Sequence, residues 1–124
     1  MMTMKTPREI AEAAVIALDG KNAHDIKLLR TSDVTVLADY FVICTATSTT
    51  QIKTLADATE AALEELGENK IHREGYRSGS WVLLDFGCVV IHLFMEEARQ
   101  FYNLERLWAD AEEIDVSALL GPDA

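Results

Sequence analysis

The segment from Trp81 to Phe94 restricts the possible folds of this chain more than any other segment does. Two runs of β-branched and aromatic residues flank the dipeptide Phe86-Gly87, and this pattern is typical of a β-hairpin. If Phe86 and Gly87 form the whole loop, the register of the two strands follows. The expected cross-strand pairs are Asp85 with Cys88, Leu83 with Val90, and Trp81 with His92.

The two sides of this hairpin differ chemically, because successive side chains of a strand point to opposite faces. One side is entirely apolar and is expected to belong to a core; it carries Val82, Leu84, Val89, Ile91 and Leu93. The other side is large and mostly apolar but includes one acid and one histidine; it carries Trp81, Leu83, Asp85, Cys88, Val90, His92 and Phe94. A face of the second kind either lies under another element of the chain or binds a partner.

The rest of the chain predicts further helices and strands. Apolar residues at helical spacing predict one helix from Pro7 to Gly20 and another that stops at Gly67. Ser48, Thr49 and Thr50 are the candidates to cap the start of the second helix. A last helix is expected from about Glu96; its apolar stripe is Phe101, Leu104, Trp108 and Ala111. Besides the hairpin, short strands are expected at residues 25–29, 40–45 and 71–74.

These elements follow one another in the order α-β-β-α-β-β-β-α, which predicts an α/β fold with helices packed on a mixed β-sheet. A chain of 124 residues is long enough for one domain with its own core. We expect that domain to span residues 1–112. The tail, residues 113–124, has little apolar surface to pack and is expected to fray.

The charge balance bears on the class of partner. A formal net charge of −10 argues against binding nucleic acid through its phosphates, because that mode needs a patch of Lys and Arg. The charge suits a basic protein partner, although acidity that only maintains solubility explains it equally well.

The cysteines and the apolar runs indicate in which cellular compartment the protein is found. The apolar runs are too short to cross a bilayer, and residues 1–10 have no apolar signal core. A cytoplasmic location without membrane contact is therefore expected. Cys44 and Cys88 lie in apolar, strand-like runs and are expected to be free thiols.

Two short motifs resemble enzyme signatures but lack the context. Residues 85–87, Asp-Phe-Gly, copy the metal-binding triplet of protein kinases, yet the chain has no Gly-rich phosphate loop and no His-Arg-Asp catalytic loop. Residues 79–80, Gly-Ser, resemble the opening of a nucleotidyltransferase site, which needs two carboxylates to hold magnesium. The following strand offers Asp85 alone, because Leu83 stands where the second acid is required. We therefore expect no enzyme activity.

The residues that could bind a metal or act as nucleophiles are also poorly arranged. Cys88 and His92 share a strand face, but four residues of strand span roughly 13 Å, whereas two ligands of one zinc ion lie a few ångströms apart. Neither cysteine has a local activating group, and no Gly-x-Ser-x-Gly elbow is present. No metal, cofactor or catalytic residue is expected, and a structural role is favoured for all three histidines.

The two tryptophans are expected to have different roles. Trp108 continues a helical stripe, which favours a core position. Trp81 starts the hairpin on its mixed face. A tryptophan exposed there is a natural anchor for a protein interface, but packing into a core explains the same pattern equally well.

Three motifs follow one another along the chain. They are Asp-Tyr-Phe-Val-Ile at 39–43, Trp-x-x-x-Asp-x-Gly-x-Val-Val-x-His-x-Phe at 81–94, and Phe-Tyr-x-Leu-Glu-x-Leu-Trp at 101–108. With Ser48, Gln51, Glu74-Gly75 and Arg99, they make residues 6–112 resemble the ribosomal silencing factor family (RsfS/Iojap). Two positions depart from the family pattern. Ala38 replaces a usual Thr, and Cys88 replaces a usual Asp or Asn, which removes a polar group from the mixed face.

The resemblance implies a non-catalytic protein that binds the large ribosomal subunit on ribosomal protein uL-fourteen. Binding there blocks docking of the small subunit and represses translation. Relatives in organelles take part in large-subunit biogenesis, and that alternative stays open. The implied fold is nucleotidyltransferase-like without catalytic acids. The family is also implied to form homodimers, so a second copy is another candidate to cover the same sheet face.

The hairpin geometry and the resemblance together predict which residues contact the partner. The expected contacts are Trp81, Leu83 and Asp85 first, then Val90, His92 and, in the loop before the hairpin, Glu74, Tyr76 and Arg77. Trp81 is expected to fill an apolar recess, and Asp85 is expected to pair with a Lys or Arg of the partner.

Overall fold

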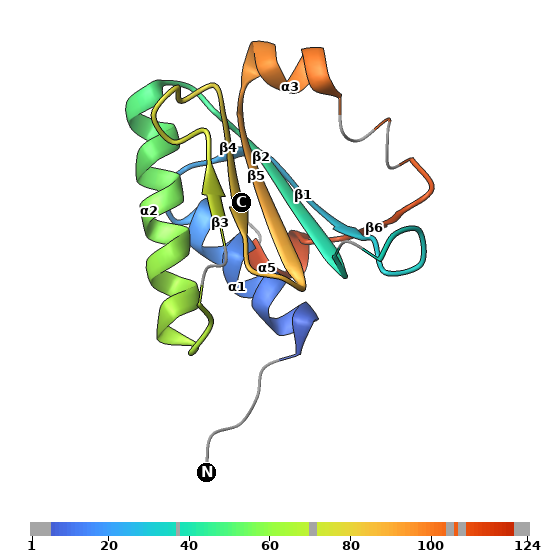
Figure 1. Ribbon diagram of the computed structural model, residues 1–124. Coiled ribbons are helices and arrows are strands. Elements are labelled where there is room, and N and C mark those ends of the chain that lie inside the picture. The colour runs from blue at the N-terminus through green and yellow to red at the C-terminus, as the bar shows by residue number, and fades with distance from the viewer. Residues whose placement is uncertain (1–5, 37, 70–71, 104–105, 107–108, 121–124) are drawn as a thin grey trace.

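The computed structural model of the chain is built on one sheet with strand order β3-β4-β5-β2-β1-β6 (Figure 1). It describes residues 6–36, 38–69, 72–103, 106 and 109–120. The strands are β1 (His24–Arg30), β2 (Tyr40–Ala46), β3 (His72–Glu74), β4 (Trp81–Asp85), β5 (Val89–Met95) and β6 (Glu112–Ile114). The helices are α1 (Pro7–Asp19), α2 (Thr49–Glu65), α3 (Glu96–Tyr102) and α5 (Ser117–Leu120).

The predicted α/β architecture, a mixed sheet with helices packed on it, is confirmed. Strands β2 and β5 pair in parallel, and the other described neighbours pair antiparallel. The order of the elements from α1 to α3 is the predicted one, whereas β6 and α5 were not predicted.

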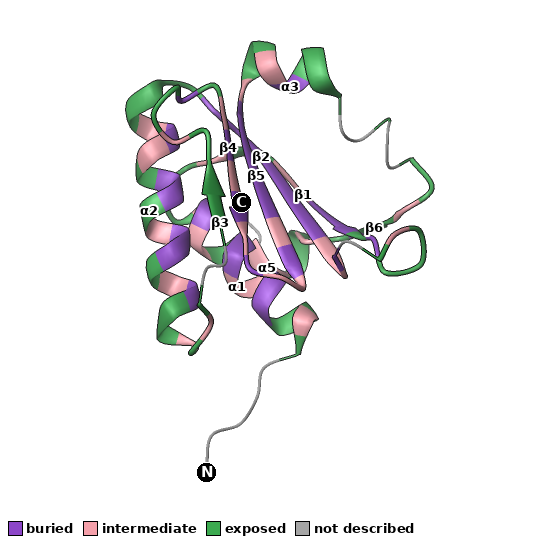
Figure 2. Ribbon diagram, in the orientation of Figure 1, coloured by how far each residue is buried: buried purple, intermediate pink, exposed green. Residues whose placement is uncertain are grey.

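The main core lies between the sheet and the helices α1 and α2, which cover the same face (Figure 1). The apolar side of the hairpin faces this core, as predicted: Val82, Leu84, Val89, Ile91 and Leu93 are each 0% exposed. Figure 2 shows the buried positions of α2 turned toward the sheet and its exposed positions turned away.

Both long helices begin where predicted, and each has a side-chain cap at its start. The Thr6 hydroxyl accepts a hydrogen bond from the Glu9 amide at 3.1 Å, and the Glu9 carboxylate accepts one from the Thr6 amide at 3.0 Å, which is a complete capping box. The Ser48 hydroxyl accepts from the Gln51 amide at 3.0 Å. At the far end of α2, Gly67 adopts a φ of 89°, a conformation that ends a helix easily only at glycine.

The predicted hairpin register is wrong by two residues. The observed pairs are Trp81–Phe94, Val82–Leu93, Leu83–His92, Leu84–Ile91 and Asp85–Val90. The loop is longer than two residues because the Phe86 amide bonds to the Val89 carbonyl at 3.0 Å and the Phe86 side chain enters the main core. A shift of two residues leaves every side chain on its predicted face, since the side-chain period of a strand is also two.

The last predicted helix is shorter than its apolar stripe. Helix α3 ends at Tyr102 because Asn103 takes a left-handed φ of 48°. Phe101, expected in the core, is 82% exposed, and Ala111 is half-buried outside any helix. The other two positions of the stripe, Leu104 and Trp108, lie outside the described residues.

The tail that was expected to fray contains strand β6 and helix α5. Strand β6 pairs with β1, and its register places Ile114 opposite Leu28. Both side chains belong to the main core, so the free edge of β1 gains backbone hydrogen bonds and an apolar contact together. Helix α5 then packs against α1. The packed chain thus continues past residue 112 through α5.

Candidate protein-binding face

The sheet face opposite α1 and α2 carries the residues that the sequence singled out. Cross-strand partners share a face, so the pairs Trp81–Phe94, Leu83–His92 and Asp85–Val90 lie on this side. We call these six residues the β4–β5 face. His92 and Phe94 are 5% and 0% exposed, whereas the other four are half-buried.

Trp81 is the centre of an aromatic cluster on this face. Its ring centre lies 5.1 Å from that of Phe94 and 4.5 Å from that of Tyr102 in α3. Its indole Nε1 donates a hydrogen bond to His92 Nδ1 at 3.2 Å. Trp81 is thus neither a fully buried core residue nor a loose surface side chain: it is a half-buried ring held by three neighbours.

His92 holds the indole as a neutral imidazole. It is 5% exposed and packs edge-on against Phe41 at 4.9 Å. Burial lowers the pKa of His92 to about 4, because the charged ring would lose its hydration. Since Nδ1 accepts from Trp81, the proton of the neutral ring is on Nε2, which has no hydrogen-bond partner among the described residues. Among the predicted contacts, His92 is the least accessible and acts by positioning Trp81.

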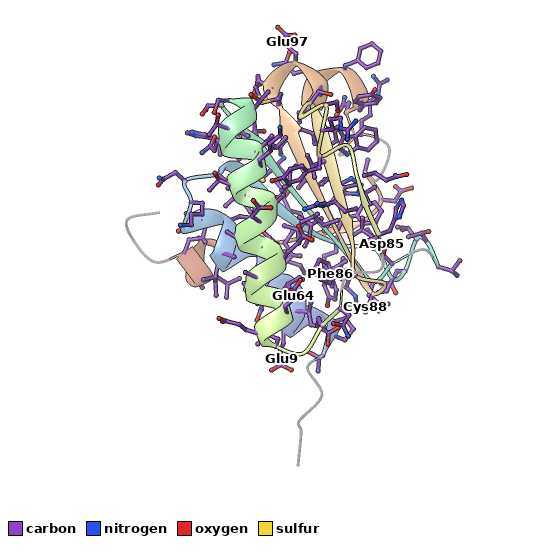
Figure 3. The ribbon with its side chains drawn as sticks, turned by 60° about the vertical axis from the view of Figure 1, so that its left-hand side comes forward. Glu9, Glu64, Asp85, Phe86, Cys88 and Glu97 are labelled. Carbon is purple, nitrogen blue, oxygen red and sulfur yellow. The ribbon has the colours of Figure 1, made fainter. Side chains whose placement is uncertain are left out.

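Asp85 combines a role in the turn with a free carboxylate oxygen. Its Oδ1 accepts a hydrogen bond from the Gly87 amide at 2.8 Å, and Gly87 has a φ of 86°. Figure 3 shows Asp85, Phe86 and Cys88 together at this end of the hairpin. The Asp-Phe-Gly triplet therefore consists of a turn acceptor, a core residue and a positive-φ glycine. Asp85 makes no ion pair within the described part of the chain.

Glu74 extends the β4–β5 face to the edge of the sheet. It lies opposite Leu83 across strands β3 and β4, and its carboxylate is 3.0 Å from Nε2 of His72. Both side chains of this pair are more than half exposed. Arg77, in the loop that follows, is also exposed.

Tyr76 is not gathered with these residues, contrary to expectation. Its hydroxyl donates to Asp57 of α2 at 3.0 Å, and the Arg73 guanidinium lies 4.1 Å from the centre of its ring. The same guanidinium donates to the buried Glu60 of α2 at 2.9 Å. The chain turns at Gly75, which has a φ of 79°, and this turn directs Tyr76 toward the helical side of the sheet. Tyr76 fastens the edge of the sheet to α2.

The sequence did not identify the two aromatic residues at the end of α3 as a single surface. Phe101 is 82% exposed and Tyr102 is 45% exposed, and their rings meet edge to face at 5.1 Å. The sequence did contain one signal. Neighbouring residues of a helix do not share a face, so two adjacent aromatic residues cannot both pack into the same core. Tyr102 turns toward Trp81 while Phe101 stays in solvent.

The described residues offer no catalytic or metal-binding arrangement. No group of three His, Cys, Asp or Glu side chains lies close enough to hold a metal ion in the described ranges. Burial raises the pKa of the Cys44 thiol to about 12 and also raises the pKa of Cys88, so both are poor nucleophiles. Among the described helices, none is long and apolar enough to cross a membrane.

Comparison with known proteins agrees with the motifs. The family model described as "Ribosomal silencing factor during starvation" matches residues 4–124. Ribosomal silencing factor RsfS of Bacillus subtilis is 38% identical over 109 residues, covering 88% of this chain and 92% of that protein. The chloroplastic protein Iojap of Arabidopsis thaliana is 40% identical over 108 residues, covering 85% of this chain and 43% of that protein.

A solved structure supports the fold. The crystal structure of protein CV0518 from Chromobacterium violaceum superimposes with a TM-score of 0.83 at 32% identity, covering 97% of this chain and all of that one. The fold, the motifs and the family match therefore agree over nearly the whole length. The chain belongs to the ribosomal silencing factor family (RsfS/Iojap), whose members are ribosome-binding factors and not enzymes.

Proposed function

We propose that the protein binds the large ribosomal subunit through ribosomal protein uL-fourteen, uses the β4–β5 face to do so, and thereby blocks association with the small subunit and represses translation. The observation that carries this proposal is the half-buried Trp81, which Phe94, Tyr102 and His92 hold in one orientation. A ring that is already ordered loses little entropy when a partner covers it, and tryptophan is enriched among interface anchors.

The charges support the same assignment. Asp85 borders the apolar centre of the face and makes no ion pair within the described residues, so a partner's Lys or Arg can pair with it. The net charge of −10 would draw a basic ribosomal protein toward the chain during encounter.

In this proposal the sheet is a nucleotidyltransferase-like scaffold that serves binding. Leu83 occupies the position where such an enzyme needs an acid two residues before Asp85. We therefore expect no saturable ATP binding, with or without magnesium, in a thermal shift assay. Saturable binding would favour a cryptic nucleotidyltransferase.

The direct test of the face is the affinity of the purified protein for large ribosomal subunits. Trp81→Ala should weaken binding by about 2–4 kcal/mol, the range of an interface anchor, which is at least about thirtyfold. Ile16→Ala is the matched control, because Ile16 is 52% exposed on α1, away from the β4–β5 face. Equal affinity of both variants, or loss of folding in Trp81→Ala, would reject Trp81 as the anchor.

Two other uses of the same surface predict different results. A homodimer closed through the β4–β5 face would compete with the large subunit, so the occupancy of large subunits would rise more slowly with protein concentration than a single-site binding curve predicts. A biogenesis factor would bind immature large particles in preference to mature subunits. Preferential binding to mature subunits supports silencing.

A further inference from the structure

A groove of about 740 Å³ lies beside the β4–β5 face. The turn before β4, with Ser78 and Ser80, lines one part of it, and α3, with Phe101 and Tyr102, lines another. Tyr102 also touches Trp81, with ring centres 4.5 Å apart. The groove is therefore continuous with the proposed binding face.

The aromatic wall of the groove is unusually exposed. Phe101 and Tyr102 are 82% and 45% accessible, and their ring planes cross at 84°. The two rings thus form a corner that offers a flat π surface to the solvent. Exposed aromatic surface beside a binding face indicates a place where a partner is accommodated.

The charged residues of the groove are acids. Glu96 and Glu97 line it, and no described residue of its lining is basic. Glu96 accepts a hydrogen bond from Gln100 at 2.8 Å. Glu97 has no partner among the described residues, and Figure 3 shows its side chain projecting outward from the first turn of α3.

The one arginine of α3 does not neutralise this wall. The Arg99 guanidinium donates to the Asp25 carbonyl at 2.6 Å and to the Thr45 hydroxyl at 2.7 Å. Arg99 is 8% exposed and so is committed to the interior. The groove thus combines an exposed π surface, an unpaired carboxylate and the hydroxyls of two serines.

We propose that this groove receives an arginine side chain of the protein partner. A guanidinium is planar, stacks on aromatic rings and pairs with carboxylates, and its five N–H donors match the hydroxyl and carboxylate acceptors. An anion would be repelled by Glu96 and Glu97. The identity of the partner rests on the proposed function, whereas the chemistry of the groove rests on its own residues.

The test is an NMR titration of the full chain with the peptide acetyl-Gly-Ala-Arg-Ala-Gly-amide. The amide signals of Gly79, Ala98 and Phe101 should shift and saturate. A matched peptide with citrulline, which keeps the shape and loses the charge, should bind about two- to fivefold more weakly or worse. A lysine peptide should also bind more weakly, because an ammonium lacks the planar fork.

Matched variants locate the site. Phe101→Ala and Glu97→Gln should each weaken binding of the arginine peptide by about two- to fivefold. Both residues are exposed, so neither substitution should disturb folding. Glu64→Gln is the control. Glu64 is an exposed acid near the C-terminal end of α2 (Figure 3), whereas the groove lies at the N-terminal end of that helix, at Thr49. Equal binding of arginine and citrulline peptides, or undiminished binding by both groove variants, would overturn the assignment. Equal binding of the lysine peptide would overturn the choice of arginine.

The titration contains no ribosome, so its outcome is independent of the proposed function. Failure of the wild-type protein to bind large subunits, with the peptide results as expected, rejects the partner and leaves the groove chemistry standing. Weaker binding of Trp81→Ala to large subunits, with no selectivity for arginine over citrulline, rejects the groove and leaves the proposed function standing.

Discussion

His92 links the stability of the protein to pH through a single buried ring. Its pKa falls from the ordinary 6.5 to about 4 in the folded chain, so the unfolded chain takes up a proton at a higher pH than the folded chain does. The contribution of the neutral ring to stability is therefore complete above about pH 6.5 and is lost as the pH falls toward 4.

This shift predicts a loss of about 2 kcal/mol in the free energy of unfolding between pH 7 and pH 5 from this residue alone. His92→Phe keeps an aromatic ring of similar size without a titrating group, so its loss over the same interval should be smaller by that amount. Urea unfolding of both proteins at the two pH values measures the difference. Identical losses would contradict a neutral, buried His92.

Gly75 permits the close approach of the loop to Trp81. A β-carbon at this position would stand 1.9 Å from the carbonyl oxygen of Trp81, and the φ of 79° already disfavours any side chain. Gly67 has a similar φ of 89° but open space around it, which makes it a matched control.

Gly75→Ala should therefore destabilise the protein more than Gly67→Ala does. Gly67→Ala should lower the free energy of unfolding by about 1 kcal/mol through backbone strain. Gly75→Ala should lower it further, because the new β-carbon must displace β4. Equilibrium urea unfolding gives both values, and equal costs would show that the loop can move without strain.

Among the secondary-structure elements, α3 extends the binding surface beyond β4 and β5, because it carries Tyr102 and the aromatic corner of the groove. Arg99 fastens this short helix to the ends of β1 and β2 through Asp25 and Thr45. Hydrogen bonds from a charged donor contribute about 1.5–3 kcal/mol.

Arg99→Ala should therefore loosen α3 locally. The amides of α3 should exchange with deuterium about tenfold to a hundredfold faster, as that free energy implies. Gln100→Ala is the control, because Gln100 is exposed and bonds to the exposed Glu96 of the same helix. Unchanged exchange in Arg99→Ala would mean that α3 is held by other contacts.

The elements also show where prediction from sequence succeeds. The faces of the hairpin were predicted correctly although its register was not, because face depends on alternation and register depends on the loop. The helices α1 and α2 were predicted correctly, because apolar residues at helical spacing and residues typical of helix ends mark them in the sequence. The end of α3 has a local signal, because Asn103 is of a residue type that adopts left-handed caps, although the apolar stripe favoured a longer helix. The pairing of β6 with β1 is a long-range contact, which local patterns do not encode.

The same distinction applies to the candidate site. Trp81, Leu83, Asp85, Val90 and His92 were grouped correctly, since one strand alternation relates them all. Tyr76 was misplaced because the turn at Gly75 decides which side of the sheet it meets, and α2 supplies the Asp57 that holds its hydroxyl. Tyr102 reaches Trp81 only through the packing of α3.

For the molecule as a whole, the net charge of −10 predicts electrostatic steering toward a basic partner. The association rate with large subunits should fall about tenfold or more as salt is raised from low to high concentration, while the dissociation rate changes little. Stopped-flow fluorescence of labelled protein separates the two rates. An association rate that does not change with salt would contradict electrostatic steering.

The central claim is that the β4–β5 face covers the surface on the large subunit where the small subunit docks. Light scattering of purified subunits measures their joining directly. Wild-type protein added to large subunits beforehand should suppress the scattering increase, and Trp81→Ala at the same concentration should leave it nearly complete. Undisturbed joining with the wild-type protein, or equal suppression by Trp81→Ala, would contradict the claim.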